Sequence, residues 1–187
     1  MLQRCSAKIT QFPLEDPVLE CIDLCQHELR TISGFWAQKA MSVASTQVGH
    51  PDTPLFVMCK RQNWYTAHQY KSFQTFLNPE IVEISEQTTT AWEGCISNDE
   101  ELCLVERPAE ALVRFQDIRG KSFELGIGGL LCRIFQHEVD HLDGQLMWLE
   151  SEGLVPRKLV EKISIAEVER IGADKFYEEN KKWILEV

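Results

Sequence analysis

The chain has 187 residues with a formal net charge of −10, and 26% of its residues are charged. This length fits one domain with a sizeable hydrophobic core. The acidic balance excludes a broad nucleic-acid-binding surface, which needs clustered lysine and arginine, and no apolar run is long enough to cross a membrane. The first ten residues lack the apolar stretch and cleavage site of a secretory signal. We therefore expect a cytoplasmic protein, with an organellar location left open.

A helix is predicted to begin at Asp16-Pro17, because aspartate suits the cap and proline the first helical position. Apolar residues recur at helical spacing from Val18 as far as Trp36. Cys21 and Cys25 lie four residues apart on this helix, and we interpret them as packed thiols rather than metal ligands. The seven cysteines of the chain are odd in number and form no compact framework, so reduced thiols are expected.

The segment 40–47 follows, with small residues and a polar amide, Gln47, at its end. It has two interpretations. It is a linker with an exposed glutamine, since glutamine is usually at the surface, or it is a segment that passes close to a functional site.

Short runs rich in β-branched and aromatic residues then predict several strands. They lie at residues 55–59, 73–77, 81–84, 88–92, 102–105, 111–116 and 122–125. Asn78-Pro79 is expected to end a strand, residues 99–101 to form an acidic solvated loop, and Asp117-Ile118-Arg119-Gly120 to turn a hairpin. Residues 60–71 have no clear period and are interpreted as a loop or hairpin that contains His68.

The sequence His137-Glu138-Val139-Asp140-His141 follows apolar residues at helical spacing. Residues four apart lie on the same face of a helix, so both imidazoles can reach one metal ion with Glu138 beside it as a base. Gly144 suits a helix end. Two histidines can also be simply packed and hydrogen-bonded, so the metal hypothesis needs a third ligand.

Cys95 is the candidate for that ligand. It lies in Glu93-Gly94-Cys95-Ile96-Ser97, where the neighbouring glycine lets the backbone approach a ligand closely. Together with His137 and His141 it would leave the fourth position open to water.

At this point the chain resembles the peptide deformylase family. That family carries a glycine- and alanine-rich segment ending in glutamine, then Glu-Gly-Cys-Leu-Ser, then Gln-His-Glu-x-Asp-His. The second motif is present here with Ile96 in place of leucine, and the third is complete from Gln136 to His141. The connecting sequence is also similar at Leu77-Asn78-Pro79 and at Gly129-Leu130-Leu131. The resemblance covers most of residues 12–150.

The first motif departs from the family pattern Gly-x-Gly-x-Ala-Ala-x-Gln. Ala40 and Ser42 replace the two glycines, Ser45 replaces one alanine, and Ala44 and Gln47 remain. In the family this segment lines the peptide groove, so the side chain of Ser42 would project where other members have none. It would either narrow the site or offer a hydroxyl to a different ligand.

A further departure follows the second motif, where a common family arginine corresponds to Leu102. Arg107 does match a family arginine. We expect it to form a supporting ion pair with Glu93, and Asp140 to lie behind the ligands or at the surface.

The resemblance implies an α+β fold with antiparallel sheets around a central helix that carries His-Glu-x-x-His. We expect one domain over residues 1–187, with a core at about 12–150 and a helical tail at 156–187. In the family the carboxy-terminal segment can associate with the ribosome. The seven basic and seven acidic side chains from Arg157 onward give that association little support.

The resemblance also implies a metal-dependent hydrolase that removes the formyl group from N-formylmethionyl peptides during N-terminal processing. Cys95, His137 and His141 would hold one divalent ion, Fe(II) in the cell, with Zn(II), Ni(II) or Co(II) as substitutes. The ion would polarise the carbonyl and acidify its water. Glu138 would take that proton and return it to the leaving amine.

The remaining roles are implied in the same way. The Gln47 amide and the Ile96 backbone N–H would hold the oxyanion. The peptide would be bound by residues of the first and second motifs: Ser42, Val43, Ala44 and Gly94.

Three alternatives stay open. One is an amidase of this fold with altered N-acyl or peptide specificity, motivated by Ser42. Another is a non-catalytic peptide-binding relative, which the presence of Glu138 and Gln47 argues against. The third is an unrelated zinc protease, which leaves Cys95 and its neighbours unexplained.

Overall fold

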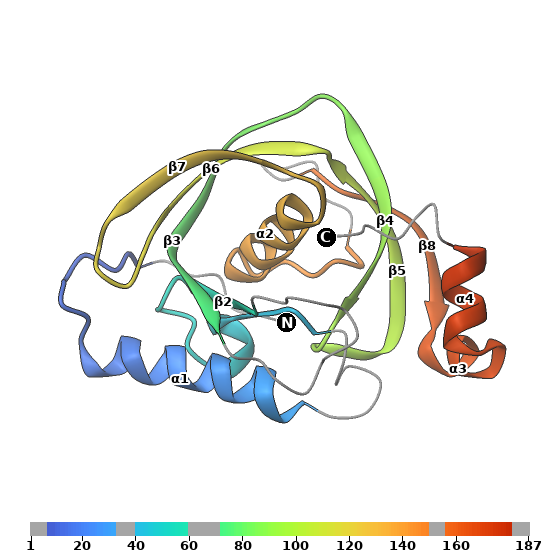
Figure 1. Cartoon of the computed structure of the whole chain (residues 1–187), viewed down its shortest axis with the longest axis horizontal. Coiled ribbons are helices and arrows are strands. Elements are labelled where there is room, and N and C mark those ends of the chain that lie inside the picture. Colours follow the sequence, from blue (N-terminus) through green and yellow to red (C-terminus); the bar gives the residue numbers. More distant parts are fainter. Residues whose placement is uncertain (1–6, 33–39, 60–71, 150–155, 181–187) are drawn as a thin grey trace.

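The computed structural model describes residues 7–32, 40–59, 72–149 and 156–180. The helices are α1 (Asp16–Thr31), α2 (Gly129–Leu142), α3 (Ile165–Ile171) and α4 (Ala173–Glu179), and a short 3-10 helix spans Ser45–Val48. The strands are β1 (Ser42–Ala44), β2 (Leu55–Cys59), β3 (Phe73–Ile84), β4 (Thr88–Cys95), β5 (Asn98–Pro108), β6 (Glu110–Gln116), β7 (Ser122–Gly128) and β8 (Lys158–Ser164). The strands surround α2 (Figure 1), so the expected α+β architecture is confirmed.

One sheet has five antiparallel strands in the order β1-β2-β3-β6-β7. The predicted hairpin between β6 and β7 is confirmed. The Asp117 N–H donates to the Lys121 carbonyl oxygen, and the Gly120 N–H donates to the Asp117 carbonyl oxygen. The expected strand end at Asn78-Pro79 is wrong, because β3 continues through this point with a shift of register against β6. Asn78 has a φ of 48°. Its side chain accepts the Ile9 N–H at 2.8 Å and donates to Gln116, which ties the amino-terminal segment to the sheet.

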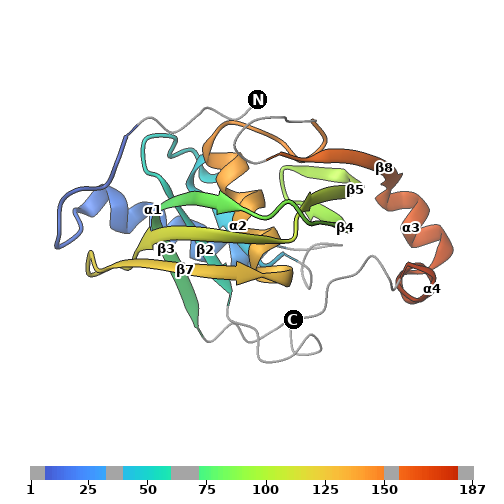
Figure 2. The same cartoon turned by 90° about the horizontal axis from the view of Figure 1, so that it is seen from above.

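The second sheet has three antiparallel strands in the order β4-β5-β8. It corrects two expectations. The acidic residues 99–101 belong to β5, where Glu101 faces Ser164 and receives a hydrogen bond from Lys162. The tail at 156–187, expected to be helical, contributes strand β8 before α3 and α4. These two helices lie beyond β8, at the end of the molecule away from β7 (Figure 2), and residues 181–187 lie outside the described part.

Helix α2 is buried over most of its length and packs on the five-stranded sheet. Phe135 makes edge-to-face contacts with Phe56 at 5.2 Å and Phe76 at 5.7 Å between ring centroids. The predicted end of the helix is confirmed, since Gly144 follows it with a φ of 74°, a conformation that glycine adopts at little cost. This packing fixes the orientation of the helix face that carries His137 and His141.

Helix α1 begins where Asp16-Pro17 predicts and ends at Thr31, short of Trp36, which lies outside the described residues. Cys21 and Cys25 are buried in the core under it, as expected of packed thiols. Leu102, the position of the missing arginine, is buried in the same hydrophobic cluster together with Val168 and Phe176. An apolar residue therefore suits this place, because the chain after residue 156 covers it.

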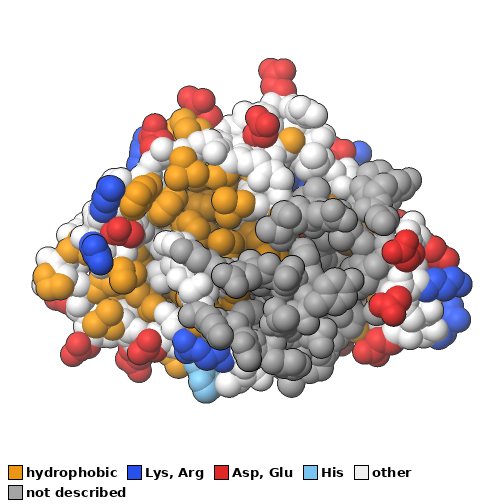
Figure 3. All heavy atoms as spheres, viewed as in Figure 1, with side chains coloured by type: hydrophobic (Ala, Val, Ile, Leu, Met, Phe, Trp, Pro, Cys, Tyr) orange, Lys and Arg blue, Asp and Glu red, His pale blue; other side chains and the backbone are white. Residues whose placement is uncertain are grey.

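The face of the molecule that carries β3, β6 and β7 is partly apolar. Figure 3 shows hydrophobic side chains gathered on the side of β3, β6 and β7, with acidic side chains around them. The exposed large hydrophobic residues of β3, β7 and α2 include Ile84, Leu125 and Leu131. In the described part of the chain, no helix has the length and apolar character needed to cross a membrane.

Candidate active site

Three segments far apart in the chain meet at the site. Cys95 is the last residue of β4, just after an irregularity in its pairing with β5. His137 and His141 lie one turn apart on α2. The strand β1 and the 3-10 helix bring Ser42 and Gln47 to the same place, which favours the functional interpretation of residues 40–47 over the linker interpretation.

The predicted ligand atoms converge. The Cys95 Sγ lies 3.1 Å from the His141 Nε2, and this nitrogen lies 3.1 Å from the His137 Nε2. All three atoms are within 4.8 Å of one another. Among the described residues, no other group of three or more His, Cys, Asp or Glu side chains brings its ligand atoms this close together. Cys95 is 3% exposed and His141 is 1% exposed, while the His137 side chain is 12% exposed.

These atoms fit a metal ion. Nitrogen ligands about 2.0–2.1 Å from a tetrahedral ion lie about 3.3 Å apart, close to the separation observed here. The other ring nitrogens are also engaged: the His137 Nδ1 lies 3.0 Å from the Glu93 Oε2, and the His141 Nδ1 lies 3.3 Å from the Gln145 carbonyl oxygen. A partner on Nδ1 fixes the ring and leaves Nε2 for the metal.

The electrostatics of Cys95 suit a ligand. Burial alone would raise the pKa of the Cys95 thiol, but hydrogen bonds with His137 and His141 outweigh burial and hold this pKa well below its usual range. The thiolate, not the thiol, is the form that binds metals. The Ser97 N–H at 3.4 Å and the Gln47 Nε2 at 3.5 Å also point at this sulfur.

Glu138 lies beside the ligands and is 2% exposed. Its Oε1 accepts a hydrogen bond from the Ser42 hydroxyl at 2.6 Å. Its Oε2 is buried and has no hydrogen-bond partner among the described residues. Burial raises the pKa of Glu138 above its ordinary value, against the opposing effects of His141, His137 and Ser42. A raised pKa makes a carboxylate a better acceptor of a proton.

Gln47 is half-buried rather than surface-exposed. Its Oε1 accepts the Ala44 N–H at 2.9 Å, and its Nε2 donates to the Ser97 hydroxyl at 2.8 Å. The amide is therefore held between the first and second motifs. Ile96, also half-buried, follows Cys95 in the turn between β4 and β5.

The four predicted substrate-binding residues differ in what they expose. Val43 and Ala44 are almost fully buried, so they can offer a substrate only their backbone groups. Ser42 and Gly94 are half-buried. Of the other histidines, His27 is exposed and apart from the cysteines of α1, and His68 lies outside the described residues.

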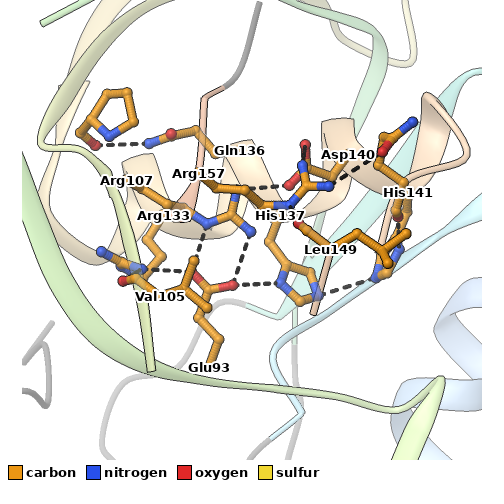
Figure 4. A network of polar contacts seen from close by, with 12 residues as sticks. Glu93, Val105, Arg107, Arg133, Gln136, His137, Asp140, His141, Leu149 and Arg157 are labelled. Atoms are coloured by element: carbon orange, nitrogen blue, oxygen red, sulfur yellow. Dashed lines mark hydrogen bonds and ion pairs between the residues drawn. The ribbon is translucent and has the colours of Figure 1, made fainter. Parts of the chain in front are cut away.

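A network of buried charges lies behind the histidines (Figure 4). Arg107 binds both oxygens of Glu93, at 2.7 and 3.0 Å, and one oxygen of Asp140 at 2.7 Å. The expected Glu93–Arg107 pair is confirmed, and Asp140 is buried behind the ligands rather than at the surface. Burial would raise the pKa of Glu93, but Arg107, His137 and Arg133 hold it well below its usual range. Glu93 therefore stays ionised and fixes His137.

Two arginines of this network were not predicted from the sequence. Arg133 donates to the Glu93 Oε1 at 2.6 Å, and Arg157 donates to the Asp140 Oδ1 at 2.8 Å and to the Leu149 carbonyl oxygen at 2.7 Å. A signal existed for Arg133, which precedes His137 by four residues and so shares its helix face. The sequence carries no comparable signal for Arg157.

Comparisons with known proteins agree with this geometry. The family model described as polypeptide deformylase matches residues 5–153. A peptide deformylase of Rickettsia typhi is 37% identical over 136 residues, which cover 70% of this chain and 75% of that protein. The crystal structure of a class I type b peptide deformylase from Acinetobacter baumannii with Met-Ala-Ser bound matches with a TM-score of 0.63 at 25% identity, over 78% of this chain and 88% of that one. A Plasmodium falciparum peptide deformylase matches the fold with a TM-score of 0.64 at 24% identity, over 95% of this chain and 88% of that one.

Proposed function

Because this chain belongs to the polypeptide deformylase family, we propose that it hydrolyses the formyl group from the amino terminus of N-formylmethionyl peptides. The observation that carries this proposal is the meeting of Glu138 with the Cys95, His137 and His141 cluster at a buried site. A purely structural metal site requires no carboxylate with an unpartnered oxygen. The products are formate and a peptide with a free amino group.

Cys95, His137 and His141 would hold a single divalent metal ion as the cofactor. A thiolate with two imidazoles suits iron and zinc as well as nickel and cobalt. We propose Fe(II) as the ion in the cell, on the strength of the family resemblance. When bound, the ion polarises the formyl carbonyl and makes water at the site more acidic.

The residues of the site carry out the remaining steps of the reaction. Glu138 accepts the proton of the attacking water on Oε2, which has no hydrogen-bond partner in the described part of the chain. A bond forms between the water oxygen and the formyl carbon. The Gln47 Nε2 and the Ile96 backbone N–H donate to the carbonyl oxygen as its negative charge grows. The C–N bond then breaks, and Glu138 returns the proton to the leaving nitrogen.

The peptide substrate would bind along β1. Among the described residues this strand is at the edge of the five-stranded sheet and pairs with β2 alone. Its outer edge can pair with an extended peptide by main-chain hydrogen bonds. The Ala44 N–H is already bound by the Gln47 Oε1, so on this edge Ala44 would contribute its carbonyl oxygen.

The experiment is formate release from formyl-Met-Ala-Ser by protein purified without oxygen and loaded with Fe(II) or Ni(II). We expect turnover that falls by about 10²–10⁴-fold in Glu138→Ala, with one metal ion per chain retained. Glu86→Ala, a change at an exposed glutamate, serves as the control and should match the wild type. Acetyl-Met-Ala-Ser, tested in parallel, reports on altered acyl specificity.

The absence of formate from protein with one metal ion per chain would refute the proposal. Cleavage of the acetyl peptide alone would then favour an amidase with altered specificity, and cleavage of neither would favour a peptide-binding role. A cytoplasmic location and an association with the ribosome remain predictions.

A further inference from the structure

Ser42 is the first residue of β1 and pairs with Met58 of β2. Its hydroxyl reaches α2, where it donates to the Glu138 Oε1 at 2.6 Å. Four residues further on, the Thr46 hydroxyl donates to the His141 carbonyl oxygen at 3.1 Å. The segment is thus attached to α2 at two points, and one of them is the carboxylate at the centre of the proposed reaction.

This contact leaves the two oxygens of Glu138 in different states. Oε1 is held by Ser42, whereas Oε2 is buried without a partner among the described residues. A hydroxyl and a carboxylate oxygen at this separation form a short, charge-assisted bond. The bond restricts rotation of the carboxylate and leaves Oε2 as the oxygen available to take a proton.

We propose that Ser42 is a positioning residue, whose hydroxyl holds Glu138 Oε1 so that Oε2 alone exchanges the proton. The inference rests on the proposed deformylase function and adds a residue to it. The first motif of the family has glycine at this position. The bond between Ser42 and Glu138 therefore depends on the replacement of that glycine by serine in this chain. The sequence suggested that Ser42 would either narrow the site or offer its hydroxyl to a different ligand. In the structure the hydroxyl binds Glu138 of the same chain.

The competing explanation is obstruction, in which the side chain of Ser42 narrows the peptide groove. The two explanations predict opposite effects of removing the Ser42 side chain on catalytic efficiency. Loss of a positioning bond to a charged group lowers kcat by about 10-fold or more and leaves KM nearly unchanged. Removal of an obstruction lowers KM or raises kcat/KM, and glycine should then improve the enzyme more than alanine does.

The test measures kcat and KM of the Ni(II)-loaded wild type and of Ser42→Ala, Ser42→Gly and Ser42→Thr on formyl-Met-Ala-Ser. We expect a loss in kcat of about 10-fold for alanine and glycine, with KM within about twofold, and recovery in threonine, which restores the hydroxyl. The matched control is Ser45→Ala. Ser45 is buried three residues along, its hydroxyl has no hydrogen-bond partner among the described residues, and its loss should leave kcat unchanged. Equal kcat in wild type and Ser42→Ala, or a gain in kcat/KM in Ser42→Gly, would overturn the proposal.

Crystal structures of the Ni(II)-loaded wild type and Ser42→Ala give a readout that does not depend on turnover. Positioning predicts that the Glu138 carboxylate rotates or takes two orientations in the alanine variant. An unchanged carboxylate would overturn it. A wild type without formate release would refute the deformylase function, while an active wild type with an unaffected Ser42→Ala would refute only the role of Ser42. Metal content and the thermal midpoint of each variant identify any change that merely disturbs folding.

Discussion

Replacing Arg107 with methionine tests the buried charge network directly. The change removes three hydrogen bonds, two to Glu93 and one to Asp140, and leaves an apolar side chain that matches only the stem of arginine in a fully buried place. Removing one partner from a buried ion pair typically costs about 3–5 kcal/mol, because the remaining charge loses its compensation. Here Glu93 keeps Arg133 and Asp140 keeps Arg157. We therefore expect a loss near the lower end, about 3 kcal/mol, in the free energy of unfolding.

The assay is urea denaturation followed by circular dichroism, in low and in high salt. Arg114→Met is the matched control, since Arg114 is also a strand arginine with two carboxylate partners, Glu124 and Glu80, but its pairs are exposed. Exposed pairs contribute little and are screened by salt, so this variant should stay close to the wild type. A loss in Arg107→Met no larger than in the control, or one that salt abolishes, would refute the reasoning.

Three further predictions concern the metal, the amino-terminal attachment and the core. Zn(II) at about a thousand times its Kd should stabilise the protein by about 4 kcal/mol. Calorimetry should show the same stabilisation in the control Cys103→Ala, which removes a buried thiol outside the ligand set. An equal stabilisation of Cys95→Ala by Zn(II) would contradict the ligand assignment. Asn78→Ala should be less stable to urea than Asn78→Gly by roughly 1 kcal/mol, because alanine is strained at the φ of 48°, and the opposite order would show that strain is unimportant. Phe135→Ala should cost about 3–5 kcal/mol in urea denaturation, whereas Leu131→Ala, at a position 38% exposed, should cost far less; similar losses would contradict the packing described for α2.

The parts of the fold that could be predicted are those with a local cause. The end of α2 follows from Gly144, and the hairpin between β6 and β7 follows from the turn residues 117–120. The histidine pair was predictable because helical spacing alone places His137 and His141 on one face. Cys95 was found through its motif, since its distance along the chain from both histidines gives no local signal.

The parts that could not be predicted depend on distant partners. Residues 158–164 contain charged residues with good helix propensity, and they become a strand because β5 offers them a pairing edge. Strand preference depends strongly on such tertiary context. Arg157 is an ordinary charged residue in the sequence, yet it is buried against Asp140 and the Leu149 carbonyl oxygen. The contact between Ser42 and Glu138 likewise joins residues 96 positions apart.

The separation of the ligands along the chain also sets an order of events during synthesis. His141 is added 46 residues after Cys95, which at about 5–20 residues per second takes about 2–9 s. Arg157 follows 17 residues after Asp140, so the charges behind the site are completed later still. A ribosome-bound chain that has already made α1 and the strands through β4 therefore carries a thiol without its histidines. Until His141 has been added, the thiol lacks a partner that lowers its pKa in the folded protein, and a metal ion cannot bind all three ligands.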